Sequence, residues 1–166
     1  VPTFSELIDG KVSIKSLREV SIVDLLGRKE IQLNRKSISN YLYGKKVLVT
    51  GAGGSIGSEL VKQCLTFDPD LLILLDQSEH NLFHIEKLAQ KNSRSVPLQT
   101  ILGDIRDKTL IERVFSSFMP DVVFHAAAYK HVPMQENHPW EAVKTNIYGT
   151  INLIDVAVDY NVNRFV

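Results

Sequence analysis

The sequence predicts an α/β protein with a doubly wound parallel sheet, and three observations lead to this prediction. From Lys46 onward, short apolar runs alternate with helical patterns across short polar connections, which is typical of strand–helix–strand units. The turn after the first run reads TGAGGSIG, residues 50–57, and has the glycine spacing of a dinucleotide-binding turn. The length of 166 residues and the 44% hydrophobic content fit one globular domain. Together they favour a Rossmann-type NAD-binding fold, truncated at the C-terminus because the sequence stops where a further strand begins.

The alternation gives the expected elements in order. Strands are expected at residues 46–50, 71–76, 96–102, 121–125 and 164–166. Helices are expected at residues 55–66, 78–91, 108–118 and about 140–160. The last helix carries a stripe of apolar residues that we expect to cover the sheet: Trp140, Val143, Ile147, Ile151, Ile154 and Val158. Right-handed crossovers between these strands produce the doubly wound sheet.

Residues 1–45 break this rhythm, since Pro2, Gly10 and Gly27 interrupt short apolar groups. We therefore predict two regions. Residues 1–45 form a linker or packing arm that precedes the catalytic domain, and residues 46–166 form the N-terminal, cofactor-binding part of a Rossmann-type domain. Ser21 and Asp24 have the spacing of a capping start for one short helix in the arm. An arm that mediates oligomerisation is the alternative, so a homo-oligomer is among the expected assemblies.

Composition and charge argue against several classes of protein. The 19 basic and 19 acidic residues balance, which gives no electrostatic reason to expect nucleic acid or an anionic membrane surface as a partner. No apolar run approaches the roughly 18 residues that span a bilayer, and the first residues have no signal-peptide pattern. We expect a cytoplasmic domain. The single cysteine, Cys64, lies on the apolar stripe of the first helix and is expected to be a buried thiol.

Each glycine of the turn has its own expected role. Gly51 permits a tight turn, Gly54 lets the backbone approach a pyrophosphate, and Gly57 lets the helix pack against the strand. Ser55 and Ile56 open that helix, whose first N–H groups are expected to point at the anion. The turn therefore predicts a dinucleotide cofactor.

Acidic residues follow the second and third strands at the same edge of the sheet. Asp76 stands where a dinucleotide fold places the acid that binds the adenosine ribose hydroxyls, which favours NAD over NADP. The alternative is that Asp76 caps the helix near Ser78, and both roles can hold. Asp104 is expected to accept a hydrogen bond from the adenine amino group, although such a residue more often caps a helix. Ser78 and Ile105 are counted with these acids as cofactor-binding residues.

Small residues follow the fourth strand, where Ala126, Ala127 and Ala128 are expected to let a flat ligand pass close to the backbone. Asn146 and Gly149 are poor helix formers inside the long helix, and they predict a local distortion that faces the site. The alternative is an exposed asparagine and a close contact between helix and sheet at Gly149.

A polar loop at residues 129–133 lies beyond the same edge, on the side where substrate would enter. Lys130 and Glu136 are our substrate-side candidates. His131 and His138 are read as surface histidines, because neither has a cysteine or acidic partner at ligand spacing, and we expect no metal.

These motifs resemble the extended short-chain dehydrogenase/reductase superfamily. Within it, HAAAYKHVP at residues 125–133, followed by KTNIYGT at residues 144–150, resembles the CapD-type polysaccharide biosynthesis proteins. These are UDP-N-acetylglucosamine 4,6-dehydratases and their close relatives. Residues 1–28 are similar to the segment that precedes the catalytic domain in the large, membrane-anchored members.

The resemblance implies an NAD-dependent lyase. In such enzymes NAD oxidises the sugar at C4, which acidifies the C5 proton, water leaves across C5 and C6, and the hydride returns to C6. The resemblance implies cofactor roles for the glycine turn, Asp76, Asp104 and residues 126–128, and the active-site asparagine role for Asn146. The expected partner is UDP-N-acetylglucosamine or a related sugar nucleotide. The full-length protein is expected to be anchored to the inner membrane through a region that precedes this chain.

The superfamily's catalytic Tyr/Met-x-x-x-Lys element and this family's Ser/Thr-Asp-Lys follow the strand that begins at Arg164. We therefore expect both to lie outside this chain, and the chain alone to be inactive. Tyr41 and Lys45 have the YxxxK spacing, but they precede the first strand and are interpreted as a coincidence. Two alternatives stay open: a nucleotide-sugar 4-epimerase, which returns the hydride to C4, and a non-catalytic NAD-binding module.

Overall fold

Five parallel strands form the centre of the structure, a computed structural model that describes residues 34–92 and 95–166. The strands are β1 (Lys46–Thr50), β2 (Leu71–Asp76), β3 (Leu98–Leu102), β4 (Val122–His125) and β5 (Arg164–Phe165). They lie in the order β3-β2-β1-β4-β5. The direction of winding reverses at β1, which confirms the predicted doubly wound, Rossmann-type sheet. The interpretations of residues 1–33, including the short helix near Ser21, lie outside the described residues.

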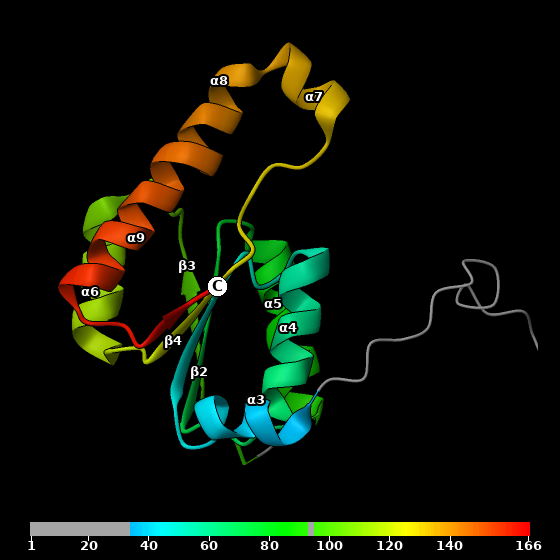
Figure 1. The fold of residues 1–166 in the computed structure, drawn as a ribbon. Helices are drawn as coiled ribbons and strands as arrows, with labels where there is room; N and C mark the ends of the chain where they lie inside the picture. Colours follow the sequence, from blue (N-terminus) through cyan, green and yellow to red (C-terminus); the bar gives the residue numbers. More distant parts are fainter. Residues whose placement is uncertain (1–33, 93–94) are drawn as a thin grey trace, which may run out of the picture. The chain divides into compact units, whose positions relative to one another are not determined.

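Helices cover both faces of this sheet, and the longer ones are α4 (Ser55–Leu65), α5 (Glu79–Asn92), α6 (Lys108–Phe118) and α9 (Thr150–Asp159). Helices α4 and α5 lie on one face, and α6 and α9 lie on the other (Figure 1). Alternate residues of β1 enter the two cores: Val47 and Val49 pack on the α4 and α5 side, whereas Leu48 packs on the α6 and α9 side. This double burial explains why β1 and β2 are continuous apolar runs.

The last part of the predicted arm contains helix α3 (Arg35–Leu42). The Ser37 N–H donates to the side-chain oxygen of Asn34 at 3.1 Å, which caps the helix. Leu42 is 2% exposed and belongs to the core on the α4 and α5 side. Residues 34–42 are therefore a packed helix and not an extended linker.

The polar loop after β4 leads into a short helix that the sequence pattern did not predict, α7 (Val132–Asn137). Pro133 stands in its first turn, where the missing proline N–H costs no hydrogen bond. The long helix then follows as three consecutive segments: α8 (Pro139–Ala142), the π-helix η2 (Val143–Gly149) and α9. The π-helical segment confirms the distortion predicted from Asn146 and Gly149.

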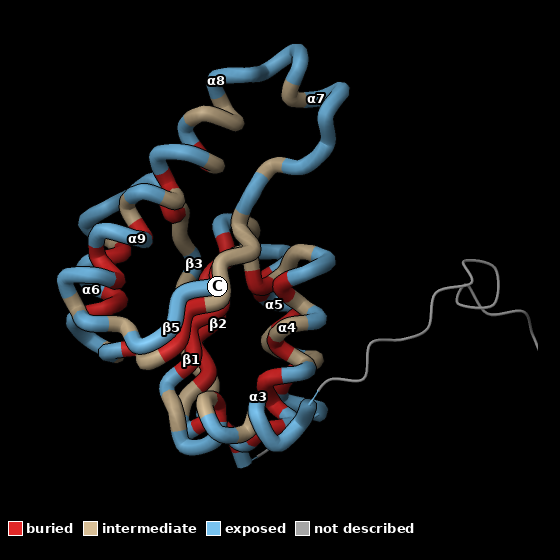
Figure 2. The backbone as a smooth tube through the Cα atoms, in the orientation of Figure 1, coloured by how far each residue is buried: buried red, intermediate tan, exposed pale blue. Residues whose placement is uncertain are grey.

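The apolar stripe predicted to cover the sheet from this helix is wrong. Most of its members are exposed, with Trp140 at 73% and Val158 at 69%, and the outer side of the helix is solvent-facing in Figure 2. The buried side carries a different set of residues, which includes Gly149: Thr145, Gly149, Leu153, Val156 and Ala157. The physical reason is steric, because a Cβ atom on Gly149 would lie 2.7 Å from the Ile105 side chain, so the close contact selects the face with the small residue.

The single cysteine was predicted to be buried. Cys64 is 2% exposed, and burial raises its pKa to about 12, so the thiol stays protonated. The prediction of a buried thiol is confirmed.

Within residues 34–92 and 95–166, no helix combines the length and the apolar content needed to cross a membrane.

The orientation of α9 can be tested with two neighbouring residues. Leu153→Ala removes a side chain that is 0% exposed and is expected to lower the free energy of unfolding by about 2–5 kcal/mol, because it leaves a cavity. Ile154→Ala, at a position that is 44% exposed, is expected to cost less than about 1 kcal/mol. Urea unfolding followed by circular dichroism measures both. A larger loss for Ile154→Ala would mean that the helix is rotated.

Candidate functional site

A cavity lies at the carboxyl edge of the sheet, where the order of the strands reverses. It is lined by the segments that follow β1, β2, β3 and β4, and it encloses about 190 Å³. Parallel strands end at the same edge, so the polar residues that follow them in the sequence converge there. Eight of the predicted cofactor-binding residues line it: Gly51, Gly54, Asp76, Asp104, Ile105, Ala126, Ala127 and Ala128.

The turn after β1 is closely packed on two sides. Gly51 has a φ angle of +63°, and a Cβ atom there would lie 2.7 Å from the carbonyl oxygen of Ala126. A Cβ atom on Gly57 would lie 2.0 Å from the carbonyl oxygen of Gly51, because α4 packs directly on the turn. Gly57 therefore supports the cavity without lining it.

Helix α4 opens toward this cavity. Its N-cap is Gly54, which lines the cavity and provides no side-chain capping bond to the first N–H groups. The side chains of Ser55 and Ile56 are exposed and lie outside the lining. The helix thus presents an uncapped, positively polarised end at the edge of the cavity, which suits an anion.

Asp76 is 7% exposed and fastens the glycine turn to the start of α5. Its Oδ2 accepts a hydrogen bond from the Gly53 N–H at 2.9 Å, and its Oδ1 accepts one from the Ser78 N–H at 2.9 Å. Each carboxylate oxygen keeps a further lone pair. The Ser78 hydroxyl accepts from the Asn81 N–H at 3.3 Å, so Ser78 caps α5 and does not line the cavity. The alternative role predicted for Asp76, to cap the helix near Ser78, is therefore present in the structure as the hydrogen bond from the Ser78 N–H.

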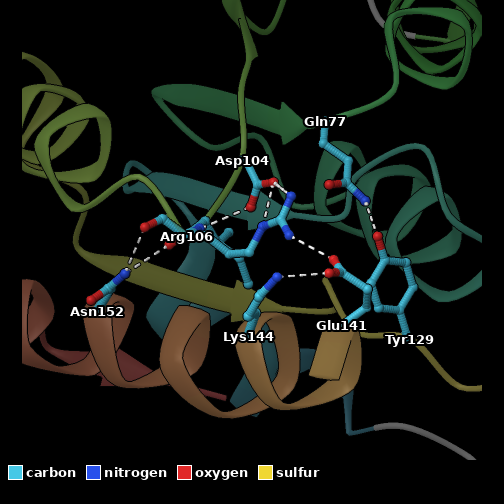
Figure 3. Close-up of polar contacts among 8 residues, drawn as sticks. Gln77, Asp104, Arg106, Tyr129, Glu141, Lys144 and Asn152 are labelled. Atoms are coloured by element: carbon cyan, nitrogen blue, oxygen red, sulfur yellow. Dashed lines mark hydrogen bonds and ion pairs between the residues drawn. The ribbon is translucent and has the colours of Figure 1, made fainter. Parts of the chain in front are cut away.

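Asp104 belongs to a charged network at the rim (Figure 3). Arg106 Nε donates to the carboxylate of Asp104 at 2.7 Å, and its Nη1 donates to Glu141 at 3.0 Å. Partial burial alone would raise the pKa of Asp104, but the hydrogen bonds and the charge of Arg106 outweigh it and hold this pKa below its ordinary value. Lys144 donates to Glu141 at 2.9 Å and extends the network to η2. The network joins the segment after β3 to the long helix.

The alanine segment after β4 forms the opposite wall. The Ala126 N–H donates to the Thr50 carbonyl at 3.1 Å, which holds the segment beside β1. Further along, the Tyr129 N–H donates to Asn146 Oδ1 at 2.8 Å, and Asn146 Nδ2 donates to the Tyr129 carbonyl at 2.9 Å. Gln77 Nε2 donates to the Tyr129 hydroxyl at 3.4 Å from the other side of the cavity (Figure 3). Asn146 is thus half-buried and bound to the loop.

The two substrate-side candidates, Lys130 and Glu136, differ in their surroundings. Lys130 lines a second hollow beside the cavity, together with Tyr129, His131, Met134, Gln135, His138 and Glu141. Glu136 is exposed on α7 and lines neither hollow. Over the part of the chain that the structure describes, no three His, Cys, Asp or Glu side chains gather as a metal site.

Sequence reasoning missed several residues of the cavity: Leu75, Gln77, Asn81, Gly103, Tyr129 and Thr145. Thr145 is the most informative, because it is 4% exposed and its hydroxyl has no hydrogen-bond partner among the described residues. A buried hydroxyl without a partner is costly, and Thr145 is one of the residues that line the cavity. Its position directly before Asn146, where the predicted distortion begins, was the available signal.

Comparisons with known proteins identify a matching family and several relatives. The sequence profile of a family described as "Polysaccharide biosynthesis protein" matches residues 47–166. The chain is 39% identical over 167 residues to the capsular polysaccharide biosynthesis protein CapD of Staphylococcus aureus, across 100% of this chain and 28% of that protein. It is 34% identical over 122 residues to a UDP-N-acetylglucosamine 4,6-dehydratase (inverting) of Campylobacter jejuni, across 73% and 35%.

The structure is similar to that of UDP-glucose 4-epimerase from Bifidobacterium longum in complex with NAD+ and UDP. The TM-score is 0.62 at 32% sequence identity, and the match covers 72% of this chain and 35% of the epimerase. The chain therefore spans about a third of the length of the proteins that it matches.

The destabilisation caused by close packing at Gly51 can be separated from that caused by its left-handed backbone by a comparison with Gly44. Gly44 and Gly51 have nearly the same φ, +64° and +63°, but a Cβ atom on Gly44 would meet only Asp70 at 3.8 Å. Gly44→Ala is expected to cost about 1–2 kcal/mol of left-handed strain. Gly51→Ala is expected to cost clearly more, because the methyl group also collides with the backbone after β4. Chemical denaturation of both variants measures the difference, and equal losses would contradict the close approach.

Proposed function

Because the chain belongs to the polysaccharide biosynthesis protein family, we propose that it is the NAD-binding portion of a nucleotide-sugar 4,6-dehydratase. The proposed substrate is UDP-N-acetylglucosamine, and the product is a 4-keto-6-deoxy sugar nucleotide for polysaccharide or glycan biosynthesis. The observation that carries the proposal is the cavity at the β1–β4 switch point, where the glycine turn, Asp76, Asp104 and the alanine segment meet. Similarity to the dehydratase from C. jejuni and to the NAD+-bound epimerase supports it.

The residues of the cavity fit NAD. The diphosphate would lie against Gly54 and the uncapped end of α4, where a side chain would occupy the space next to the backbone. Asp76 would use its remaining lone pairs for the ribose hydroxyls, and Asp104 would accept from the adenine amino group. The unpartnered hydroxyl of Thr145 would gain its missing hydrogen bond from the ligand. The 190 Å³ enclosed here is below the roughly 300–1,000 Å³ of a typical ligand pocket, so these residues form one part of the site.

We propose NAD rather than NADP as the cofactor. The additional phosphate of NADP on the adenosine ribose would face the Asp76 carboxylate at short distance, and like charges repel. Arg106 follows the cavity-lining Asp104 closely in the sequence, and Asp104 and Glu141 already bind its guanidinium group. The carboxylate at Asp76 therefore favours the dinucleotide without the phosphate.

Bound NAD would supply a reversible oxidation of the sugar at C4. In this chain, Asn146 holds the backbone of Tyr129 and so keeps the wall of the cavity in place. Lys130 and Glu136 are proposed substrate-side residues, with Lys130 in the hollow next to the cavity. Asn146 therefore has a positioning role in the proposal.

We place the proton-transferring pair of the whole enzyme outside residues 1–166. The YxxxK match at Tyr41 and Lys45 lies before β1, at the edge of the sheet opposite to the cavity. The Arg164 guanidinium lies 4.7 Å from the centre of the Tyr41 ring, and Lys45 Nζ lies 3.8 Å from an Asp121 carboxylate oxygen. These contacts support the interpretation of the match as a coincidence.

Two other functions remain as alternatives. A 4-epimerase would share the C4 oxidation, and the similarity to the epimerase from B. longum favours it specifically. A non-catalytic NAD-binding module would use the same cavity without chemistry. We also propose, from the resemblance of residues 1–28, that the full-length protein is membrane-anchored with this domain facing the cytoplasm, and that it forms a homo-oligomer.

Cofactor binding is testable on the chain itself by isothermal titration calorimetry. We expect NAD+ to bind at least about tenfold more tightly than NADP+, a difference of about 1.4 kcal/mol. Thr145→Val is expected to weaken NAD+ binding about fivefold or more, because the ligand loses a hydrogen bond. The same substitution is expected to leave the thermal stability of the ligand-free protein unchanged or raised, since it removes an unpartnered buried hydroxyl.

Thr66→Val is the matched control for this experiment. Thr66 is exposed at the C-cap of α4, away from the cavity, so NAD+ affinity is expected to stay at the wild-type value. Wild-type affinity in Thr145→Val would remove the threonine hydroxyl from the proposed site. Equal binding of NAD+ and NADP+ would remove Asp76 as the selective group.

Catalysis is testable by comparing this chain with the full-length protein. With UDP-N-acetylglucosamine and NAD+, the chain is expected to give no turnover, and the full-length protein is expected to release a 4-keto-6-deoxy sugar nucleotide. Mass spectrometry separates the outcomes, because dehydration lowers the mass of the product and epimerisation does not. A product of unchanged mass would favour the epimerase, and turnover by the chain alone would overturn the placement of the catalytic pair.

A further inference from the structure

His125, at the end of β4, lies between two threonine hydroxyls from different parts of the chain. Its Nδ1 is 2.8 Å from Thr50 Oγ1, at the end of β1, and its Nε2 is 2.9 Å from Thr150 Oγ1, at the start of α9. Thr50 is 0% exposed, and the histidine ring is half-buried. The ring therefore connects the strand that precedes the glycine turn with the helix that follows the π-helical segment.

The protons of this chain of hydrogen bonds can be assigned from the acceptors. The Thr150 hydroxyl lies 2.8 Å from the carbonyl oxygen of Asn146, and a carbonyl oxygen can only accept, so the single hydroxyl proton points there. Thr150 Oγ1 must then accept from His125, which puts a proton on Nε2. Burial lowers the pKa of His125 and so favours the neutral ring, whose Nδ1 accepts from the Thr50 hydroxyl.

The Asn146 carbonyl matters because it lies inside η2. In an α-helix this carbonyl would accept the Thr150 N–H, but that N–H donates to the Ile147 carbonyl instead. The Thr150 hydroxyl takes the place that the backbone N–H has left. The side chain of the same asparagine then makes its two hydrogen bonds to the backbone of Tyr129, at 2.8 and 2.9 Å.

We propose that His125 is a positioning residue for the wall of the cavity. Its Nε2–H holds the Thr150 hydroxyl on the carbonyl of Asn146, which keeps the π-helical turn in the shape that aims the asparagine amide at Tyr129. Residues 126–129 line the cavity directly after the histidine. The backbone of Thr50 holds the first of them, and Asn146 holds the last. The His125 ring connects these two supports through the hydroxyls of Thr50 and Thr150. The effect on ligand affinity rests on the proposed function, whereas the effect on the loop does not.

The test uses two substitutions that each keep one half of the ring's hydrogen bonds. His125→Gln can place an amide N–H where Nε2–H stands, and His125→Asn can reach only the Nδ1 position beside Thr50. In amide hydrogen exchange followed by NMR, His125→Asn and Thr150→Val are expected to lower the protection of the Tyr129 N–H about fivefold or more. His125→Gln and Thr150→Ser, which keep the donor and the hydroxyl, are expected to restore it to near the wild-type value.

The nitrogen chemical shifts of the wild-type ring give an independent measurement that no folding failure of a variant can obscure. We expect a neutral ring protonated at Nε2, and protonation at Nδ1 instead would overturn the proposal. Unchanged Tyr129 protection in a folded His125→Asn variant would also overturn it. NAD+ titration of the same variants separates the two claims, since a wild-type chain that fails to bind NAD+ contradicts the proposed function but leaves the exchange result intact.

Discussion

The close approach between the turn after β1 and the segment after β4 sets the geometry of the carboxyl edge. Gly51 leaves no room for a methyl group against the backbone of Ala126, and α4 presses on the same turn at Gly57. The turn and the start of α4, which follow one another in the sequence, therefore meet the distant segment after β4 in backbone contact. Asp76 adds a hydrogen bond to Gly53 from the next strand. The cavity lies directly above this junction, so its floor is made of backbone whose position depends on the lack of side chains.

The sheet and the floor of the cavity were predictable because their signals are local. The bounds of β1, β2 and α6 agree with the predicted ranges, and the glycine spacing between an apolar run and a helical pattern located the turn. The face of α9 was not predictable, because both sides of the helix carry apolar residues and the choice depends on Gly149 meeting Ile105. Helix α7 was also missed, since a six-residue helix with a proline in its first turn leaves little periodic signal. Local patterns give elements, whereas tertiary contacts decide which face an element buries.

The side-chain partners at the site were beyond sequence reasoning for the same reason. Asp104 was expected to meet a ligand, yet it also binds Arg106, which reaches Glu141 on the long helix 35 positions further on. Asn146 was expected to face the site; it does not line the cavity itself, but it holds the backbone of Tyr129, which does. For Thr145, the sequence offered no signal beyond its place next to Asn146. Its significance is apparent only from the burial of its hydroxyl without a protein partner.

The contact between Gly149 and Ile105 responds to solution conditions differently from the ion pairs at the rim of the cavity. The rim network of Arg106 is made of partly exposed ion pairs, which added salt screens. The contact at Gly149 is van der Waals packing of a helix backbone on an aliphatic side chain, and neither ionic strength nor protonation alters it. The spacing between the long helix and the segment after β3 is thus set by steric exclusion. High salt would weaken the ion pairs at the rim of the cavity, while the distance between the long helix and Ile105 would stay constant.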